Sequence, residues 1–402
     1  MSTSQTLKGF RDFLPETMAV RSRVINILKS VFEKYGFSEL QTPTLEYAEV
    51  LLGKSGTEAE KLMYLFKDPG GRDVGLKYDL TVPLARVMTQ YPNLPKPFKR
   101  YQIQPAFRAE NTQKGRYREF YQCDIDTVGT ASPLADAEIL AVISDSLTAL
   151  GFKEFKIRIN SRQILFGTTG DLNVLQSIDK LDKKSVDEVR DELKQKNISG
   201  SEITNIFAKL ETAQPNDNLR QIIDLAQKLG AKNIKFDARL VRGLDYYTGA
   251  IFETLVTEPK VGSITGGGRY DNLIKSLGGP DLPAVGTSFG LDRICDVIKE
   301  LNLWPDAVLT PTQVLVTIFS PELLDKSIEL SIKLRQAGGG VELYPDDRIK
   351  LEKQLKYASQ KGIPYVAILG PEEIAKNQVT VKNMFTGEQK CLPESELISF
   401  FS

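Results

Sequence analysis

The most informative segment of the sequence runs from Phe107 to Gln122 and reads FRAENTQKGRYREFYQ. Two apparent strands flank a polar loop in which three cations, Lys114, Arg116 and Arg118, stand close together. Because paired strands fix the register of a hairpin, such a loop directs several cations at one place, where they can bind phosphate oxygens. Considered alone, the segment favours the simpler interpretation of a solvated hairpin tip.

The composition excludes several kinds of catalysis. The chain has 402 residues, with 52 Lys+Arg against 52 Asp+Glu, and contains no histidine. This absence excludes Ser-His-Asp and Cys-His nucleophilic systems, zinc sites that contain histidine, and a histidine general base. Catalysis must therefore rest on carboxylates, arginines, lysine, tyrosine, backbone dipoles or a bound ion. The zero net charge also argues against a general nucleic-acid coating protein, so a nucleic-acid partner requires local basic patches.

The sequence offers no sign of a membrane or a secretory pathway. No stretch is apolar over the ~18 residues that a membrane span needs, and residues 1–14 are polar, unlike a signal peptide. We therefore expect a cytoplasmic protein with no membrane partner. The cysteines Cys123, Cys295 and Cys391 are odd in number and far apart, which predicts neither a disulfide framework nor a zinc knuckle.

The length predicts two or three domains of roughly 100–200 residues each. Apolar residues at three- and four-residue spacings predict helices over 17–35 and 134–150, and each ends at a glycine. Alternating apolar and polar residues over 101–107 and 120–128 predict antiparallel strands. From about 162 to 232 glycine becomes scarce and charge dense, which indicates a helical insertion.

A proline-bearing linker over 306–312 is expected to separate a first domain, 1–305, from a second, 313–402. After the linker, strand patterns alternate with helix patterns, and a Thr386-Gly387 turn separates the last two strands. This alternation predicts a compact α/β module with a sheet of mostly parallel strands covered by helices.

Three further segments are unusual. LVRGLDYYTG (240–249) places Arg242 and Asp245 among apolar residues in an expected buried strand, and buried charge is costly unless it is paired or used. A structural salt bridge is the alternative. GGGRYD (266–271) either lets the backbone approach a ligand closely or forms a turn. In GTSFGLDR (286–293) a glycine-bearing strand runs into a helix that carries an arginine in its first turn.

Together these segments resemble the histidyl-tRNA synthetase family of class II aminoacyl-tRNA synthetases. The resemblance joins KGFRDFLP (8–15) to the N-terminal signature, LQTP (40–43) to motif 1, 107–122 to motif 2, 286–293 to motif 3, and 240–248 and 267–271 to the two histidine-specific signatures. It implies an α+β catalytic domain, in which helices flank an antiparallel sheet, with a helical insertion, followed by a C-terminal α/β anticodon-binding domain. Motif 1 builds the dimer interface in this family, so a homodimer is implied.

The resemblance also implies a reaction. L-histidine and ATP would give histidyl-adenylate and pyrophosphate, and the histidyl group would pass to the 3' end of tRNA(His). The nucleophile is the carboxylate of the substrate, so the protein has to align charges rather than activate a side chain. Mg²⁺ would bridge phosphate oxygens, with no metal ligand identified among the protein side chains.

Roles follow for individual residues by resemblance. Arg108 would hold the α-phosphate of ATP, and Arg242 would bridge that phosphate and the substrate carboxylate, which makes these two the catalytic residues. The implied ATP contacts are Arg108, Glu110, Arg116, Phe120 and Arg293. The implied histidine contacts are Asp79, Thr81, Gln122, Asp126, Arg242, Tyr246, Tyr247 and Tyr270.

Two positions depart from the common family pattern, since many members carry glutamate at Asp126, and bacterial members typically carry it at Asp79. At Asp126 the shorter side chain shortens the reach to a substrate imidazole. For tRNA, Lys114 and Arg118 would meet the acceptor end. In the C-terminal module a plain solvated loop and an anticodon contact are both open for Arg348 and Lys350.

Three alternatives remain at this stage. The first is a non-catalytic regulatory subunit of ATP phosphoribosyltransferase, which shares the catalytic fold. Such proteins usually lack the anticodon-binding domain and have eroded motifs, whereas the arginines and the C-terminal module are present here. The second is a synthetase for another amino acid, against which the 240–248 signature argues. The third is an RNA-binding protein without catalytic activity.

Overall fold

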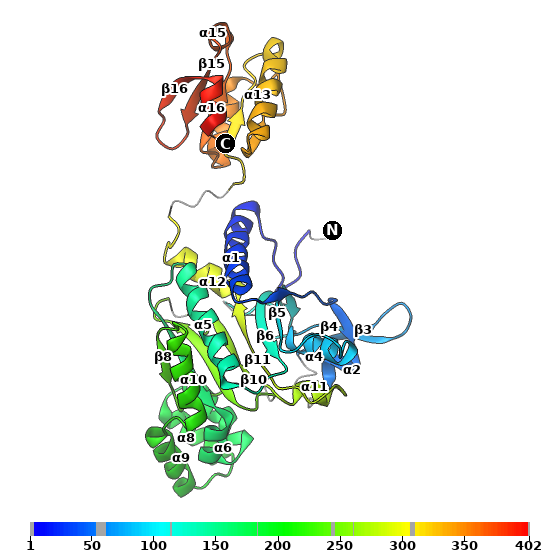
Figure 1. The fold of residues 1–402 in the computed structure, drawn as a ribbon, viewed down its shortest axis with the longest axis vertical. Helices are drawn as coiled ribbons and strands as arrows, with labels where there is room; N and C mark the ends of the chain where they lie inside the picture. Colours follow the sequence, from blue (N-terminus) through cyan, green and yellow to red (C-terminus); the bar gives the residue numbers. More distant parts are fainter. Residues whose placement is uncertain are drawn as a thin grey trace. The chain divides into compact units, whose positions relative to one another are not determined.

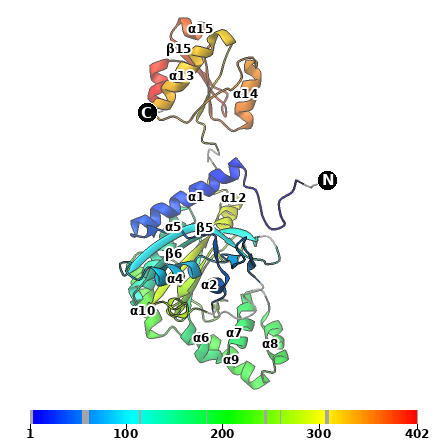
Figure 2. The same ribbon diagram turned by 90° about the vertical axis from the view of Figure 1, so that its right-hand side faces the viewer.

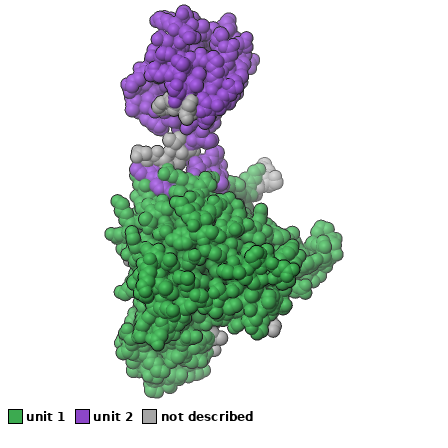
Figure 3. All heavy atoms as spheres, in the orientation of Figure 1, with its two compact units in different colours: residues 1–12, 21–303 green, residues 13–20, 304–402 purple. Residues whose placement is uncertain are grey.

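The computed structural model describes residues 4–53, 62–112, 115–182, 184–242, 246–259, 261–305 and 310–400. The chain divides into two compact units, which Figure 3 distinguishes by colour. The first unit comprises residues 1–12 and 21–303, and the second comprises residues 13–20 and 304–402. In the described parts of the chain no helix combines the length and the apolar character needed to cross a bilayer.

An eight-stranded sheet forms the centre of the first unit, in the order β1-β5-β6-β11-β10-β9-β7-β8. Its strands are β1 (Ser38–Glu39), β5 (Phe98–Phe107), β6 (Glu119–Val128), β7 (Phe155–Ser161), β8 (Ile234–Phe236), β9 (Ala250–Val256), β10 (Thr265–Arg269) and β11 (Ala284–Gly290). The short edge strands β1 and β8 pair parallel with their neighbours, and the strands between them pair antiparallel. The expected α+β class is therefore confirmed, with parallel edges that the sequence pattern did not indicate.

Three helices cover one face of this sheet: α1 (Pro15–Lys34), α5 (Pro133–Ala149) and α12 (Leu291–Glu300) (Figures 1 and 2). The apolar stripe of α1 is buried. Its Phe32 ring lies 5.8 Å from the ring of Tyr101 on β5 and 5.4 Å from that of Phe289 on β11. This packing of an amphipathic helix on the apolar face of a sheet supplies a large part of the hydrophobic core.

A small sheet of order β2-β4-β3 lies beside the central sheet, together with three helices (Figure 1). These elements are β2 (Leu45–Tyr47), α2 (Ala48–Leu52), β3 (Tyr64–Lys67), β4 (Asp73–Leu76), α4 (Thr81–Gln90) and α11 (Leu273–Ser276). The helix α4 follows β4 closely, and the carbonyl oxygen of Leu80 at its N-terminus accepts a hydrogen bond from Arg100 of β5. It therefore brings the polar residues at its N-terminus next to the central sheet.

The segment between β7 and β8 is helical. It forms α6 (Arg162–Thr169), α7 (Leu172–Ile178), a 3-10 turn (Asp179–Asp182), α8 (Val186–Gln195), α9 (Gly200–Thr212) and α10 (Asp217–Lys228). Ser185 and Glu188 form a capping box that starts α8, and Ser199 and Asn216 cap α9 and α10. Figures 1 and 2 show α6, α8 and α9 gathered at the end of the first unit that lies away from α12.

The second unit contains a five-stranded sheet of order β13-β12-β14-β15-β16. Its elements are β12 (Val314–Val316), a 3-10 turn (Pro321–Leu323), α13 (Leu324–Gln336), β13 (Val341–Leu343), α14 (Leu351–Gln360), β14 (Tyr365–Ile368), α15 (Pro371–Ala375), β15 (Gln378–Asn383), β16 (Gln389–Pro393) and α16 (Glu394–Phe400). Only β13, β12 and β14 are parallel, so the expectation of a mostly parallel sheet is wrong for its last two strands. The turn around Thr386-Gly387 is too short for the crossover that parallel strands need.

Candidate functional site

The central sheet has a buried polar face and an apolar face. Side chains alternate between the faces along a strand, and residues paired across strands share a face. One face carries buried polar side chains of β5 and β6, paired in register as Arg100 with Asp126, Gln102 with Asp124, and Gln104 with Gln122. The opposite face carries Tyr101, Ile125 and Phe289 and packs against the helices. The polar face is therefore the floor of the candidate site.

Glycines on β10 and β11 leave room on this floor for large side chains. A methyl group added at Gly266 would lie 2.5 Å from Cζ of Arg242, and one added at Gly286 would lie 2.5 Å from Cγ of Asp126. Both glycines lie inside strands, so the turn that is the alternative for 266–271 is not found at Gly266. The glycine run instead accommodates functional side chains, since real Cβ contacts are longer than these distances.

Four arginines lie within electrostatic reach of one another. Burial lowers the pKa of Arg293, and the positive charges of Arg116, Arg242 and Arg108 lower it further, against the opposing charge of Glu253. Like charges this close are unfavourable unless an anion binds between them. The cluster is therefore a candidate site for a polyanion such as a nucleotide triphosphate.

Protein groups hold two of these arginines in place. Arg293 donates from Nη1 to the carbonyl oxygen of Ser263 at 2.6 Å and from Nε to that of Gly115 at 3.4 Å. Nη1 of Arg242 lies 3.8 Å from Oε1 of Glu253, while its buried Nε has no hydrogen-bond partner. Both guanidinium groups thus keep donors for a ligand.

The segment that carries Arg242 is not a strand, contrary to expectation. Residues 240–242 and 246–249 have no strand structure, and β9 begins only at Ala250. A turn in which the Leu240 N–H donates to Asp237 precedes Arg242, so Arg242 reaches Gly266 on the polar face from a loop. Asp245, the expected partner of Arg242, lies outside the described residues.

Arg108 and Phe120 lie side by side at the end of the β5–β6 hairpin. Nε of Arg108 donates to the carbonyl oxygen of Tyr78 at 3.1 Å, and its Cζ lies 5.0 Å from the ring centroid of Phe120. This distance is within the range of a cation–π contact. The hairpin therefore presents one cation and one aromatic face together, as a nucleotide site requires.

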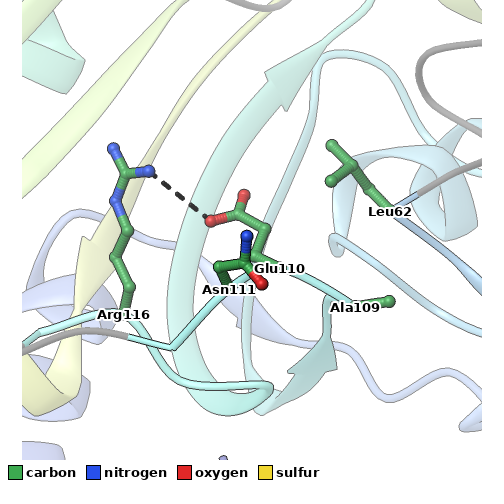
Figure 4. Close-up of a pocket in the computed structure, with 5 residues that line it drawn as sticks. All are labelled: Leu62, Ala109, Glu110, Asn111 and Arg116. Carbon is green, nitrogen blue, oxygen red and sulfur yellow. Dashed lines mark ion pairs between the residues drawn. The ribbon is translucent and has the colours of Figure 1, made fainter.

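A pocket opens beside this hairpin and is lined by Leu62, Ala109, Glu110, Asn111 and Arg116 (Figure 4). Nη1 of Arg116 lies 3.6 Å from Oε2 of Glu110. The side chain of Arg116 is 42% exposed, so it can turn toward a ligand at little cost. The two polar residues predicted for ATP contacts in this loop are therefore neighbours.

Three tyrosines form a cluster beside the polar face. The ring of Tyr246 lies 4.9 Å from that of Tyr247 and 5.8 Å from that of Tyr270, and the Tyr270 hydroxyl donates to Asp126. Tyr247 and Tyr270 are buried. The structure therefore brings together four of the residues predicted for the histidine pocket.

Asp126 has a partner that the sequence did not reveal. Nη2 of Arg100 lies 2.7 Å from Oδ2 of Asp126, and Arg100 is fully buried. Burial raises the pKa of Asp126, and the charge of Arg100 and the Tyr270 hydrogen bond act in the opposite direction. The alternation of β5 was a usable signal, because it places Arg100 on the same face as Gln102 and Gln104.

Asp79, Thr81 and Gln122 lie on the same side of the site. Asp79 accepts from the backbone N–H of Val82 at 3.0 Å and so caps α4, whose first residue is the buried Thr81. Nε2 of Gln122 donates to Oγ of Ser288 at 2.8 Å. Oδ2 of Asp79 and Oε1 of Gln122 are buried without a hydrogen-bond partner, which leaves acceptors free for a ligand.

Of the two residues predicted to contact the acceptor end of tRNA, the structure describes only Arg118. Lys114 lies outside the described residues. Arg118 donates from Nε to the carbonyl oxygen of Glu110 and from Nη1 to that of Lys8, and its N–H donates to Gly9. Arg118 therefore ties the N-terminal segment to the β5–β6 hairpin, while its contact with tRNA stays a prediction.

In the second unit Arg348 is highly exposed, and its Nε donates to Asp346 at 3.2 Å. Lys350 precedes α14 and is exposed. The nearby rings of Tyr344 and Tyr357 lie 5.7 Å apart, edge to face. These contacts leave both alternatives for Arg348 and Lys350 open.

Asp292 is a structural anchor that the sequence did not reveal. Its Oδ1 accepts from Arg11 and Arg21 at 2.6 Å each, and its Oδ2 accepts from the backbone N–H of Tyr121 at 3.2 Å. One buried carboxylate thus joins the N-terminal segment, the start of β6 and the first turn of α12. The signal was a carboxylate directly before Arg293 in a helix that packs on the sheet.

The site therefore combines a cation-rich cluster with a pocket of carboxylates and tyrosines. The described residues contain no group of three or more His, Cys, Asp and Glu able to hold a metal ion. Such a site fits an anionic nucleotide next to a zwitterionic small molecule. The mixed sheet with this polar face and its glycine floor is the architecture of a class II aminoacyl-tRNA synthetase.

Comparisons with known proteins identify the family. The family model for histidyl-tRNA synthetase matches residues 9–294, and a model for the anticodon binding domain matches residues 313–402. A histidine–tRNA ligase from Aeropyrum pernix is 41% identical over 418 residues, which cover 97% of this chain and 96% of that protein. The chain therefore belongs to the histidyl-tRNA synthetase family.

Solved structures agree with this assignment. A histidyl-tRNA synthetase from Nostoc sp. PCC 7120 matches with a TM-score of 0.87 at 29% identity, covering 100% of this chain and 99% of that chain. A protein from Bacillus halodurans described as an ATP phosphoribosyltransferase regulatory subunit/histidyl-tRNA synthetase matches with a TM-score of 0.73 at 22% identity, covering 88% of this chain and 96% of that chain. The second match shows the common fold alone.

Proposed function

We propose that this chain activates L-histidine with ATP and transfers it to the 3' end of tRNA(His). The observation that carries the proposal is the arginine cluster of Arg108, Arg116, Arg242 and Arg293, which shares one floor with a buried carboxylate and tyrosine pocket. The first part suits a triphosphate, and the second suits the ammonium and imidazole groups of histidine. A regulatory subunit without synthetase activity would have no need for both.

The activation step needs positioning and charge stabilisation. An oxygen of the histidine carboxylate forms a bond to the α-phosphorus of ATP, the bond from that phosphorus to pyrophosphate breaks, and pyrophosphate leaves. Arg242 and Arg108 hold fixed positive charge at the carboxylate and the α-phosphate, where negative charge develops. Arg293 and Arg116 bind the departing phosphates. Bound Mg²⁺ would neutralise charge on the phosphate oxygens.

The nucleotide base has a defined place beside these arginines. Phe120 offers its ring to adenine, and Glu110 lines the pocket that opens beside the same hairpin (Figure 4). Because Arg108 already lies over the ring of Phe120, ATP can bind with its base stacked and its α-phosphate at the guanidinium group. This places the reactive phosphorus at the boundary between the two halves of the site.

Recognition of histidine depends on buried polar groups. Asp79 and Gln122 receive the α-ammonium group, with Thr81 beside Asp79, and Asp126, Tyr247 and Tyr270 surround the imidazole, with Tyr246 packed against both tyrosine rings. A substrate without the imidazole N–H would leave a buried acceptor unpaired, and sites of this kind reject analogues by on the order of 10⁴–10⁵. Since Asp126 is bound to Arg100 and Tyr270, its acceptor is fixed in orientation before the ligand arrives.

The remaining partners follow from the two units. The anticodon-binding unit, residues 313–402 in the matched family model, binds the anticodon of tRNA(His). Lys114 and Arg118 meet the acceptor end, and the motif 1 region around 40–43 mediates a homodimer. The enzyme works in the cytoplasm, where its tRNA is found.

The proposal is tested by ATP–pyrophosphate exchange in the presence of each amino acid in turn. Exchange should require histidine, and exchange that is independent of histidine or greatest with another amino acid would contradict the proposal. Arg108→Ala should lower kcat by about 10²–10³-fold. The matched control is Arg220→Ala on α10, which removes an exposed arginine far from the site and should leave exchange unchanged.

A further inference from the structure

Besides Oδ2 of Asp126, which is ion-paired with Arg100, three buried oxygen atoms of the candidate site have no hydrogen-bond partner. They are Oδ2 of Asp79, Oε1 of Gln122 and Oδ1 of Asp124. A buried acceptor without a partner costs free energy of the folded state, so three of them near one another indicate a ligand that supplies the missing donors. Asp124 was not among the predicted site residues.

The three acceptors are neighbours. Gln122 and Asp124 are two residues apart on β6 and so share the polar face, and the register places Ser288 directly opposite Asp124. Ser288 accepts a hydrogen bond from Gln122, and its own hydrogen bond to Asp124 is one of the interactions that lower the pKa of that carboxyl. The two carboxyls of Asp79 and Asp124 lie within electrostatic reach of each other, since the charge of Asp79 raises the pKa of Asp124.

The charge of this corner is only partly balanced by the protein, since Arg100 acts on both Asp79 and Asp124 and Arg108 acts on Asp79, but neither arginine pairs directly with them. Asp126 is paired with Arg100, whereas neither Asp79 nor Asp124 forms an ion pair with any residue that the structure describes. Burial raises the pKa of both, and that of Asp124 rises to about 7. Two buried carboxyls within electrostatic reach of each other favour the binding of a cationic ligand group.

We propose that Asp124 is the third acceptor for the α-ammonium group of the amino-acid substrate, completing a set with Asp79 and Gln122. An ammonium group has three N–H donors, which match the three unpartnered oxygens in number. The inference rests on the proposed function, because it assigns a further specificity-determining residue to the same site. A substrate without the α-ammonium group would leave all three acceptors unpaired.

A proton is linked to this binding. Without a ligand Asp124 is about half protonated near pH 7, and a bound ammonium group favours its ionised form, so binding releases the proton. Histidine affinity should therefore rise with pH as pH increases toward and past 7. The titratable and charged groups within electrostatic reach of Asp124 are Asp79, Arg100, Cys123, Asp126, Tyr247 and Tyr270.

The first experiment compares two ligands. Isothermal titration calorimetry on the full chain measures the affinity for histidine and for imidazolepropionate, which lacks the α-ammonium group. Asp124→Asn should weaken histidine binding about 10- to 100-fold, because a charged acceptor becomes a neutral one, and should leave imidazolepropionate unaffected. The control Asp217→Asn, at an exposed position of α10, should change neither affinity.

The second experiment counts protons. Titrations in buffers of different ionisation enthalpy should show that the wild type releases more protons per histidine at pH 7 than Asp124→Asn does. If Asp124→Asn does not fold, Ser288→Ala replaces it. Loss of that hydrogen bond should move the midpoint of the pH dependence of histidine affinity upward.

The outcomes separate the two proposals. Equal loss of both ligands in Asp124→Asn, unchanged histidine affinity, or an unchanged proton count and midpoint would overturn the role of Asp124 while leaving the enzyme a histidine-binding protein. A wild type that neither binds histidine nor exchanges pyrophosphate with it would overturn the proposed function instead.

Discussion

Gly266→Ala tests whether the glycine floor of β10 exists to seat Arg242. A methyl group at this position would lie 2.5 Å from Cζ of Arg242, whereas ordinary contacts are at least 3.4 Å, so the guanidinium group must move by about 1 Å. A displacement of ~1 Å in a catalytic group can cost on the order of 10²-fold in rate. We therefore expect kcat for ATP–pyrophosphate exchange to fall about 100-fold.

Stability should change little in the same variant. The atoms that the methyl group meets belong to the far end of a flexible side chain, and the strand backbone of Gly266 is not in the left-handed region. Gly267→Ala is the matched contrast, because its methyl group would overlap the carbonyl of Gly286 and lie 2.6 Å from Cα of Thr287. Backbone atoms cannot give way, so this neighbour should lose about 1–3 kcal/mol of unfolding free energy, measured by chemical denaturation.

A double-mutant cycle with Arg242→Ala completes the test. If Gly266→Ala acts only through Arg242, the double variant should be no slower than Arg242→Ala alone. Wild-type kcat in Gly266→Ala would refute the reasoning, as would additive losses in the cycle. Equal loss of stability in Gly266→Ala and Gly267→Ala would mean that the glycines serve strand packing alone.

Three further predictions concern two residues of the site and the oligomeric state. Arg242→Ala should lower kcat for exchange by about 10²–10³-fold, with a much smaller effect on histidine binding by calorimetry, and equal losses would assign Arg242 to binding. Asp126→Ala should weaken histidine binding and also cost about 3–5 kcal/mol of unfolding free energy, because it leaves the buried Arg100 unpaired; a variant with unchanged stability would show that the pair is dispensable. Sedimentation should find a dimer, and a clean monomer at micromolar concentration would count against the motif 1 interface.

The elements of both units follow closely from sequence periodicity. The helix expected over 17–35 is α1 (Pro15–Lys34), and the strand expected over 120–128 is β6 (Glu119–Val128). These segments have one apolar face and one polar face, so burial selects one structure for them. The same reasoning failed where burial does not depend on a regular element.

The loop that carries Arg242 shows why. Leu240 and Val241 are buried and apolar, as in a strand, but they reach the core from a turn at Asp237 rather than from a hydrogen-bonded ladder. The pattern of apolar residues in a short segment indicates which side chains are buried. It does not distinguish a strand from a loop that packs on a sheet, because both bury apolar side chains. The antiparallel direction of the last two strands of the second unit, β15 and β16, was not predicted for a related reason. An alternation of strands and helices does not specify strand direction.

The ion pairs inside the site could not be predicted from the sequence, for a different reason. Arg100 and Asp126 face each other because β5 and β6 are in one particular register, and Asp292 joins segments that lie 281 and 271 residues away in the chain. A motif marks which residues matter, whereas a buried ion pair between strands depends on long-range geometry. The residues identified by resemblance therefore lie together on one floor, while their partners emerged only from the structure.

Because the chain contains no histidine, a proton released near pH 7 has to come from another kind of side chain. In most proteins a proton exchanged near pH 7 belongs first to a histidine side chain. Here no such group exists. Burial raises the pKa of Asp124 to about 7 and lowers that of Lys77 to about 8, and it also raises the pKa of Asp79 and Asp126. Lys77 is hydrogen-bonded to Thr42 and Gln104, so it has partners in the absence of a ligand. Any proton that the protein itself releases when histidine binds at neutral pH is therefore expected from the buried carboxyls of the proposed pocket, and Asp124→Asn tests the share that belongs to Asp124.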